Sequence, residues 1–218
     1  DYSINVVEIP MSSVKNLKAG NANISFMTSE LKQYEYLDKS FKTAVEKGRR
    51  DIHFKMLARM RAIYDSPSKT AVAQQLMDSL DGRKLFFCAT TKQAEQISKH
   101  VYHNKSDGKS FRDFIDGNID EIAMVNKGGT GATYKAIDHL VLVQADSDNN
   151  GLTSQKLCRT LLQQKEYTAI IWILCLGGTQ DVKWIEAALK RFDKSKVKYI
   201  PQSALNHEIQ KGSKIIKV

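Results

Sequence analysis

The sequence is poor in proline and cysteine and contains no long apolar run. Three prolines and three cysteines occur among its 218 residues. Its apolar runs fall well short of the roughly 18 residues that a membrane-spanning helix needs. The opening residues DYSINVVEIP also lack the basic and apolar regions of a signal peptide. We therefore expect a cytoplasmic protein that does not enter a membrane.

The few cysteines and histidines form no pattern of metal ligands or disulfides. Cys88, Cys158 and Cys175 are odd in number and far apart, and each lies in an apolar or helical segment. No CxxC pair or Cys/His cluster has the spacing of a zinc site, and the five histidines are scattered. The sequence predicts reduced cysteines and no bound metal.

Acidic residues are outnumbered by basic ones. The chain carries 33 lysine and arginine residues against 24 acidic ones, which gives a formal net charge of +9. Such an excess favours a polyanionic partner, because lysine and arginine neutralise phosphates and release condensed counterions. A generic basic surface would have the same composition, so charge alone does not decide between the two interpretations.

Residues 1–67 contain two strand candidates, at residues 4–9 and 23–27, and two amphipathic helices. The first helix is predicted to begin at a cap, Thr28 or Ser29, and to end at Gly48. The second is basic and is predicted to run from Asp51 to Pro67. It can lie along a phosphate backbone or form a solvated face that packs on a core, and we favour the solvated face.

Residues 68–201 alternate apolar strands with helices. Strands are predicted at residues 84–88, 121–125, 139–144, 169–176 and 197–200. A helix is predicted over 68–80, and Thr90 or Thr91, and Thr179, are predicted to cap two more. This alternation indicates an α/β fold with a mostly parallel sheet covered on both faces. We expect three parts: a connecting or inserted segment over 1–67, the α/β domain over 68–201, and a basic tail over 202–218 that is peripheral or partly disordered.

Ligands of open parallel sheets bind where loops leave the carboxyl ends of the strands. This rule selects four loops, at residues 89–92, 126–134, 145–154 and 177–181. The strongest candidate for a ligand site is NKGGTGAT at residues 126–133, whose glycines allow a close backbone approach to phosphate. Lys127, Thr130 and Thr133 add a cation and two hydroxyls. Taken alone, such a loop is more often a tight turn than a ligand site.

Three segments in fixed order resemble a known family. They are LFFCATTKQAEQI at residues 85–97, FIDGNIDEIAMVNKGGTGATYKAIDHLVLV at 114–143 and SQKLCRT at 154–160. Their order and spacing resemble motifs IV, V and VI in the second motor domain of superfamily 2 helicases. The resemblance is to the DEAD/DEAH type, of the phage or mobile-element kind. It covers about residues 68 to 200 and implies a RecA-like fold.

The resemblance implies roles for particular residues. Arg159 would act as an arginine finger on the γ-phosphate, and Gln155 would contact ATP or the neighbouring motor domain. Gly131 and Thr133 would also lie on the nucleotide side. Three loops would contact the nucleic-acid backbone, through Thr90, Thr91, Lys92, His103, Asn104, Lys105, Lys127, Gly129 and Thr130. The threonines at 90 and 91 are equally compatible with plain helix capping, and residues 103–105 with a surface turn.

Three positions depart from the family pattern. Cys158 stands where the family has glycine, Leu162 where it has a second arginine, and Thr133 where it has an acidic residue or asparagine. Either Arg159 acts alone, or Lys165 compensates, or the activity is weak.

The sequence lacks a GxxxxGK[ST] loop and an apolar strand that ends in DExH or DEAD. In the family these motifs belong to the first motor domain, which holds the ATP phosphates and magnesium. The resemblance therefore implies ATP with Mg²⁺ as cofactor, held mainly by a first motor domain outside this chain, and a chain that is inactive by itself. The start at Asp1 is consistent with a fragment. As partners we expect that motor domain and single-stranded nucleic acid, DNA rather than RNA.

Two other function classes stay open. A non-catalytic nucleic-acid-binding or partner-docking module with a degenerate helicase fold would explain Cys158, Leu162 and Thr133. A stand-alone α/β enzyme that uses the glycine loop is a weaker alternative, because no paired carboxylates and no Ser/His/Asp set fall on the four loops.

Overall fold

The computed structural model describes residues 2–20, 23, 25–125, 137–145 and 169–215, which form two compact units. One unit combines Asp1–Ile9 with Lys69–Val218, and we call it the α/β unit. The other is Pro10–Ser68, which we call the inserted unit because the α/β unit precedes and follows it in the sequence.

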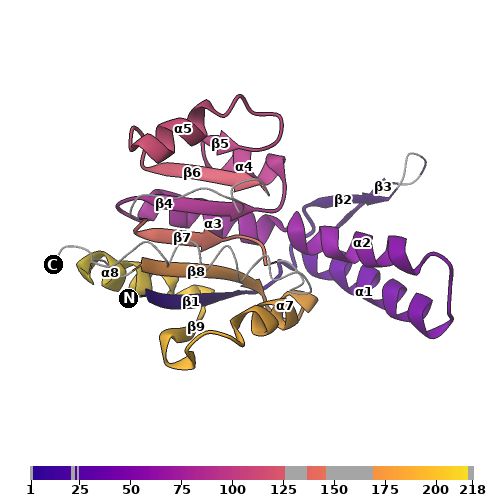
Figure 1. The fold of residues 1–218 in the computed structure, drawn as a ribbon. Helices are drawn as coiled ribbons and strands as arrows, with labels where there is room; N and C mark the ends of the chain where they lie inside the picture. Colours follow the sequence, from indigo (N-terminus) through magenta and orange to yellow (C-terminus); the bar gives the residue numbers. More distant parts are fainter. Residues whose placement is uncertain (1, 21–22, 24, 126–136, 146–168, 216–218) are drawn as a thin grey trace. The chain divides into compact units, whose positions relative to one another are not determined.

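The α/β unit is built on a seven-stranded sheet with the order β5-β6-β4-β7-β8-β1-β9 (Figure 1). Every pair of neighbouring strands in it is parallel. The strands are β1 (Tyr2–Ile9), β4 (Lys84–Cys88), β5 (Val101–Tyr102), β6 (Glu121–Val125), β7 (His139–Leu142), β8 (Ala169–Leu176) and β9 (Val197–Pro201). The predicted parallel α/β sheet is confirmed, and β4, β6 and β8 have the predicted bounds.

Strand β1 belongs to this sheet, whereas the sequence analysis placed residues 1–67 together in a separate segment. β1 pairs with β8 along its whole length, from Tyr2 opposite Ala169 to Ile9 opposite Leu176, and with β9 on its other side. The adjacent residues Val6 and Val7 are both fully buried, so both faces of the strand are covered. Its partners lie more than a hundred residues away in sequence, and no local pattern identifies them.

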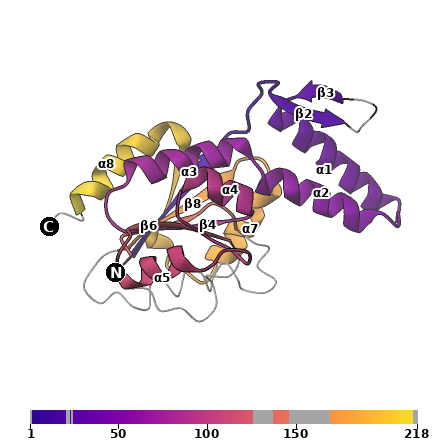
Figure 2. The same cartoon turned by 90° about the horizontal axis from the view of Figure 1, so that it is seen from above.

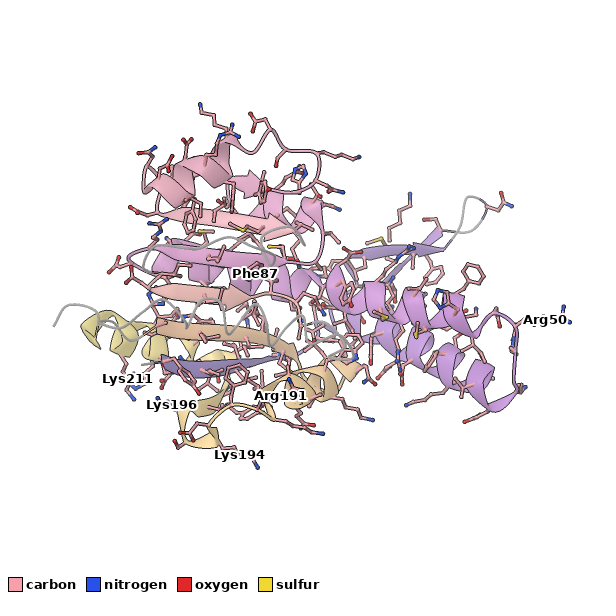
Figure 3. All side chains as sticks on the ribbon, in the orientation of Figure 1. Arg50, Phe87, Arg191, Lys194, Lys196 and Lys211 are labelled. Carbon is pink, nitrogen blue, oxygen red and sulfur yellow. The ribbon has the colours of Figure 1, made fainter. Side chains whose placement is uncertain are left out.

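The core is densest in the middle strands. All eight residues of β8 are buried, and Phe87 of β4 lies within the sheet at 2% exposure (Figure 3). Strands buried on both faces read as continuous apolar runs, which is why their bounds could be predicted.

Helices cover both faces of the sheet (Figure 2). One face carries α3 (Pro67–Ser79), α4 (Thr91–Ile97) and α8 (Leu205–Ile215). Two side-chain amides of α3 connect it to its neighbours. Gln74 donates a hydrogen bond to the Gln96 carbonyl in α4, and Gln75 donates one to the Asn206 side chain in α8, both at 2.7 Å. α5 (Lys109–Asp116) lies on the other face. In α7 (Gln180–Leu189), Trp184 is 8% exposed and packs in the core.

Helix starts follow the capping chemistry of the sequence. Thr90 caps α4 and Thr179 caps α7, and each side chain accepts a hydrogen bond from a backbone N–H of the first turn. The expectation that Pro67 ends the preceding helix is wrong, because α2 (Ile52–Tyr64) ends earlier and Pro67 is the first residue of α3. Proline suits that position, since the first N–H groups of a helix have no intrahelical acceptor.

The expected basic tail contains ordered elements. β9 is preceded by the short 3-10 helix η2 (Lys194–Lys196) and followed by η3 (Gln202–Ala204), which leads into α8. Leu205 is fully buried and Ile209 is 5% exposed. Two apolar residues four positions apart therefore dock α8, a signal too short to recognise among lysines and glutamines.

The inserted unit consists of a hairpin and two helices. β2 (Leu17–Gly20) and β3 (Ser25–Thr28) are antiparallel and form a two-stranded sheet of their own. α1 (Glu30–Glu46) begins at its predicted cap, Ser29. The second helix, α2, was expected to be a solvated basic helix, but Arg59 is 9% exposed and donates to Asp38 of α1 at 3.0 Å. Its guanidinium also lies 4.2 Å from the centre of the Phe41 ring.

A buried carboxylate joins the two ends of the inserted unit. Glu30 is 4% exposed and accepts from the backbone N–H of Ser12 at 3.0 Å. The hydroxyls of Ser66 and Ser68 also donate to it. Such a carboxylate needs several donors, because an unsatisfied buried charge would be costly.

Among the residues that the structure describes, no helix combines the length and apolar character needed to cross a membrane.

His139 makes the stability of the α/β unit depend on pH. Its Nδ1 accepts from the indole N–H of Trp172 at 3.3 Å, and burial lowers its pKa to about 4. The pKa of an unfolded histidine is about 6.5, so the unfolded state binds more protons between these values and stability falls as pH drops through that window. From pH 7.5 to 5, His139 should cost about 2 kcal/mol of unfolding free energy.

Urea unfolding of the wild type and of His139→Gln at both pH values measures this contribution. The variant should lose less stability on acidification than the wild type. His207→Gln, at an exposed histidine, is the control and should keep the wild-type pH dependence. Equal slopes for all three proteins would contradict the assignment.

Candidate nucleic-acid and nucleotide interface

The parallel sheet brings the predicted loops to one edge. Because all seven strands run in the same direction, the segments after β4 and β5 both leave the sheet at its carboxyl edge. Tyr102 of β5 pairs with Met124 and Cys88 of β4 pairs with Val125, so β6 lies between the two strands. The chain also enters residues 126–136 from this edge.

Six predicted site residues lie within the described part of the chain, and seven do not. Those described are Thr90, Thr91, Lys92, His103, Asn104 and Lys105. Those outside the described residues are Lys127, Gly129, Thr130, Gly131, Thr133, Gln155 and Arg159. Cys158, Leu162 and Lys165 lie outside them as well, so the roles inferred for these positions stay predictions.

Thr90 is engaged within its own helix. Its hydroxyl oxygen accepts from the backbone N–H of Gln93 at 3.2 Å. The Gln93 side chain in turn accepts from the Ala89 N–H at 3.0 Å and donates to Thr70 at 3.2 Å. This reciprocal arrangement satisfies free N–H groups at the helix start and supports capping as the role of Thr90. Thr91 is half-buried and Lys92 is exposed.

Residues 103–106 form a tight turn after β5. The Nδ1 atom of His103 accepts from the backbone N–H of Lys105 at 3.2 Å. The hydroxyl of Ser106 accepts from the His103 N–H at 3.2 Å and donates to the His103 carbonyl at 2.8 Å. His103 therefore shapes the turn, while the side chains of Asn104 and Lys105 are exposed at its tip.

A buried ion pair lies beneath the same edge. The Nζ of Lys69, in the first turn of α3, lies 2.5 Å from Oδ2 of Asp181, and both side chains are fully buried. Lys69 also donates to the side chain of Gln144 at 3.3 Å. Oδ2 of Asp181 accepts from the Leu176 backbone N–H at 2.9 Å. The pair thus joins the start of α3, the end of β8, the start of α7 and the segment after β7.

Sequence reasoning missed this pair. Lysine in the first turn of a helix is usually solvated, and Asp181 was considered only as the last residue of the predicted ligand loop at 177–181. The available signal was Gln144, a polar residue two positions beyond the end of β7 and directly before the predicted ligand loop at 145–154. Within the described residues, Oδ1 of Asp181 is buried without a hydrogen-bond partner.

A separate basic area borders the other edge of the sheet. Arg191, Lys194 and Lys196 gather beside β9 (Figure 3). Because they precede the amino end of β9, they lie opposite the carboxyl-edge loops. The Lys196 Nζ is 4.6 Å from the centre of the Tyr2 ring, and Lys198 pairs with Glu208 at 2.7 Å. Lys196 and Lys198 therefore make contacts within the α/β unit itself.

In the described part of the chain, no three His, Cys, Asp or Glu side chains are grouped as they would be around a metal ion.

Solved structures that resemble this chain include three of the DEAD-box protein Dbp5. The C-terminal domain of the DEAD-box protein Dbp5 matches with a TM-score of 0.53 at 15% identity, over 67% of this chain and 91% of that one. S. cerevisiae Dbp5 bound to RNA and ADP BeF3 matches with 0.56 at 14% identity, over 68% of this chain and 42% of that one. A variant S. cerevisiae Dbp5 C-terminal domain bound to a Gle1 variant and IP6 matches with 0.52 at 15% identity, over 69% of this chain and 92% of that one.

This chain therefore has the fold of the C-terminal, RecA-like domain of DEAD-box helicases. It spans less than half of the Dbp5 chain that was solved with RNA. No protein-family model and no curated protein sequence matches it.

The capping and binding roles of the two threonines can be separated. Thr90→Ala removes the cap and should lower the unfolding free energy by about 1 kcal/mol. Thr91→Ala, its matched neighbour, should change it by less than about 0.5 kcal/mol. Urea unfolding followed by circular dichroism measures both. Equal losses in the two variants would contradict the assignment of the cap to Thr90.

The buried pair should show strong energetic coupling. Lys69→Met leaves Asp181 buried without its cation, which should cost about 3 to 5 kcal/mol of unfolding free energy. In a double-mutant cycle with Asp181→Asn, the double variant should lose at least about 1 kcal/mol less than the sum of the single losses. Additive losses in urea unfolding would show that the two side chains do not stabilise each other.

Proposed function

We propose that the α/β unit is the second motor domain of an ATP-dependent nucleic-acid helicase or translocase. One observation supports the proposal: the sheet is of the RecA-like helicase type, and the first two family-like segments contain its strands β4, β6 and β7. β4 leads into residues 89–92, β6 leads into the glycine loop, and SQKLCRT precedes β8.

ATP would lie between this unit and a first motor domain, with its phosphates and Mg²⁺ held mainly by that other domain. Bound ATP would supply the free energy for movement through its hydrolysis. This chain would contribute Arg159 and Gln155, with Gly131 and Thr133 beside the nucleotide. Arginine suits the task because its planar, permanently charged group stabilises charge on phosphoryl oxygens.

Nucleic acid would lie along the carboxyl edge. Thr91, Lys92, Asn104 and Lys105 are the described side chains that are accessible there, and Lys127, Gly129 and Thr130 would extend the contact. Contacts to phosphates position a strand without reading its sequence, so binding should be largely sequence-independent. The sequence analysis favours DNA, whereas Dbp5 was solved with RNA, so both ligands belong in the test.

A non-catalytic docking module is the second candidate. Cys158, Leu162 and Thr133 favour it, because they replace residues that the family uses near ATP. The C-terminal domain of Dbp5 has been solved bound to Gle1, so this fold supports protein contacts in that relative.

Arg159→Ala tests the finger role in the protein that carries both motor domains. Loss of an arginine finger should reduce nucleic-acid-stimulated ATP hydrolysis about 1000-fold or more, since the developing charge loses its stabilising partner. Arg159→Lys should restore little, because the ammonium lacks the planar fork. Arg191→Ala, at the opposite edge of the sheet, is the matched control and should hydrolyse ATP normally.

Unchanged turnover in Arg159→Ala would remove this residue from the mechanism. If the wild-type protein itself hydrolyses no ATP with single-stranded DNA or RNA present, the docking-module function is favoured instead. Thermal unfolding of each variant shows whether a loss of activity reflects loss of folding.

A further inference from the structure

Exposed apolar side chains are concentrated in the inserted unit. Among the described residues, the large hydrophobic side chains with high exposure in this unit are Val14, Phe26, Met27, Tyr36, Val45 and Phe54. In the α/β unit, Tyr199 alone falls in this class among the described residues. Exposed apolar groups in such number usually mark an interaction site, since folding alone gains nothing from them.

Two of these side chains line a cavity. The cavity has a volume of about 590 Å³, is open to solvent, and is lined by residues of the β2–β3 hairpin and of α1. Its lining residues are Ala19, Gly20, Phe26, Thr28, Lys32, Gln33, Tyr36 and Leu37. Phe26 is 56% exposed and Tyr36 is 70% exposed, so both rings are accessible.

The register of the elements explains why the cavity is open. Phe26 pairs with Ala19 across the hairpin, and alanine is too small to cover the ring. Phe26 and Thr28 point to the same face, because side chains two apart in a strand do so. On α1, Lys32 and Tyr36 are four residues apart and therefore neighbours on the helix surface. Ser29 fixes this turn by accepting from the Lys32 N–H at 3.2 Å.

The inserted unit is also strongly basic. Residues 10–68 contain 11 lysines and arginines against 6 acidic residues, a net charge of +5 out of the chain's +9. Two of the acidic residues are used internally: Glu30 accepts from serines, and Asp38 pairs with Arg59 at 3.0 Å and with Lys42 at 2.7 Å. Burial alone would raise the pKa of Asp38, but the hydrogen bonds from Lys42 and Arg59 lower it overall. Asp38 therefore stays charged and offsets part of the positive charge of Lys42 and Arg59.

We propose that this cavity binds single-stranded nucleic acid, with a base stacked against Phe26 and Tyr36 and a neighbouring phosphate paired with Lys32. Accessible aromatic rings beside cations are the chemistry of single-strand binding, because every base has a face that stacks and every linkage carries a negative charge. The core of a protein interface is instead depleted of charged residues, and here Lys32 lines the cavity itself.

The site would be a second nucleic-acid contact of the motor. This proposal rests on the proposed function in one respect, the choice of nucleic acid as the class of ligand. The chain leaves the sheet for the inserted unit after Ile9, at the carboxyl end of β1, and re-enters the α/β unit at Lys69.

Fluorescence anisotropy with the full chain and labelled 20-nucleotide DNA and RNA strands tests the site. Phe26→Ala and Tyr36→Ala should each weaken binding about fivefold or more, since each removes a stacking surface. Phe54→Ala is the matched control, because Phe54 is 72% exposed on α2 and does not line the cavity. It should bind as the wild type does. Lys32→Ala should lower the slope of log affinity against log salt by about one.

An abasic strand of the same length separates stacking from charge. It keeps the phosphates and lacks the bases, so it should bind the wild type more weakly than the normal strand. It should bind the Phe26→Ala/Tyr36→Ala variant about as well as the normal strand does. This loss of discrimination is specific to stacking in the cavity.

Wild-type affinity in both single variants, or an equal loss in Phe54→Ala, would overturn the proposal. So would failure of the wild-type chain to bind either strand. A change in sedimentation on Phe26→Ala would instead assign the cavity to a second copy or a protein partner. The proposed motor function is tested separately, by the rate of ATP hydrolysis in the Arg159→Ala variant.

Discussion

Parallel pairing of seven strands is the constraint on which the rest of this structure depends. It places every carboxyl end at one edge, so segments far apart in the sequence meet there. It also requires both faces of the middle strands to be covered, which explains the continuous apolar runs and the helices on each side. The accessible side chains of Thr91, Lys92, Asn104 and Lys105 follow strands that end at this edge.

The Lys69–Asp181 pair connects the elements beneath that edge. Two fully buried charges at 2.5 Å connect the first turn of α3 with the first turn of α7, and Gln144 adds the segment after β7. An uncompensated buried charge is costly, so these elements are stable only in the arrangement that keeps the pair together.

The inserted unit follows different rules. It builds its own hairpin, its own helix pair and its own buried carboxylate, Glu30, which fastens its two ends. Its apolar surface is left open, whereas the α/β unit buries nearly all of its large hydrophobic side chains in the described residues. The proposed single-strand site depends on these exposed aromatic rings and on the basic charge of this unit, which is more than half of the net charge of the chain.

Local sequence patterns determined the elements of this protein. The bounds of β4, β6 and β8 follow from uninterrupted apolar runs, and the starts of α1, α4 and α7 follow from Ser29, Thr90 and Thr179. The family resemblance supplied the roles expected of Gln155 and Arg159. Only the tertiary structure decided that β1 joins the sheet, that Lys69 is buried, and that Phe26 and Tyr36 share a cavity. The reason is physical: caps and periodicity act within a few residues, whereas strand partners and buried pairs are selected by burial across the whole chain.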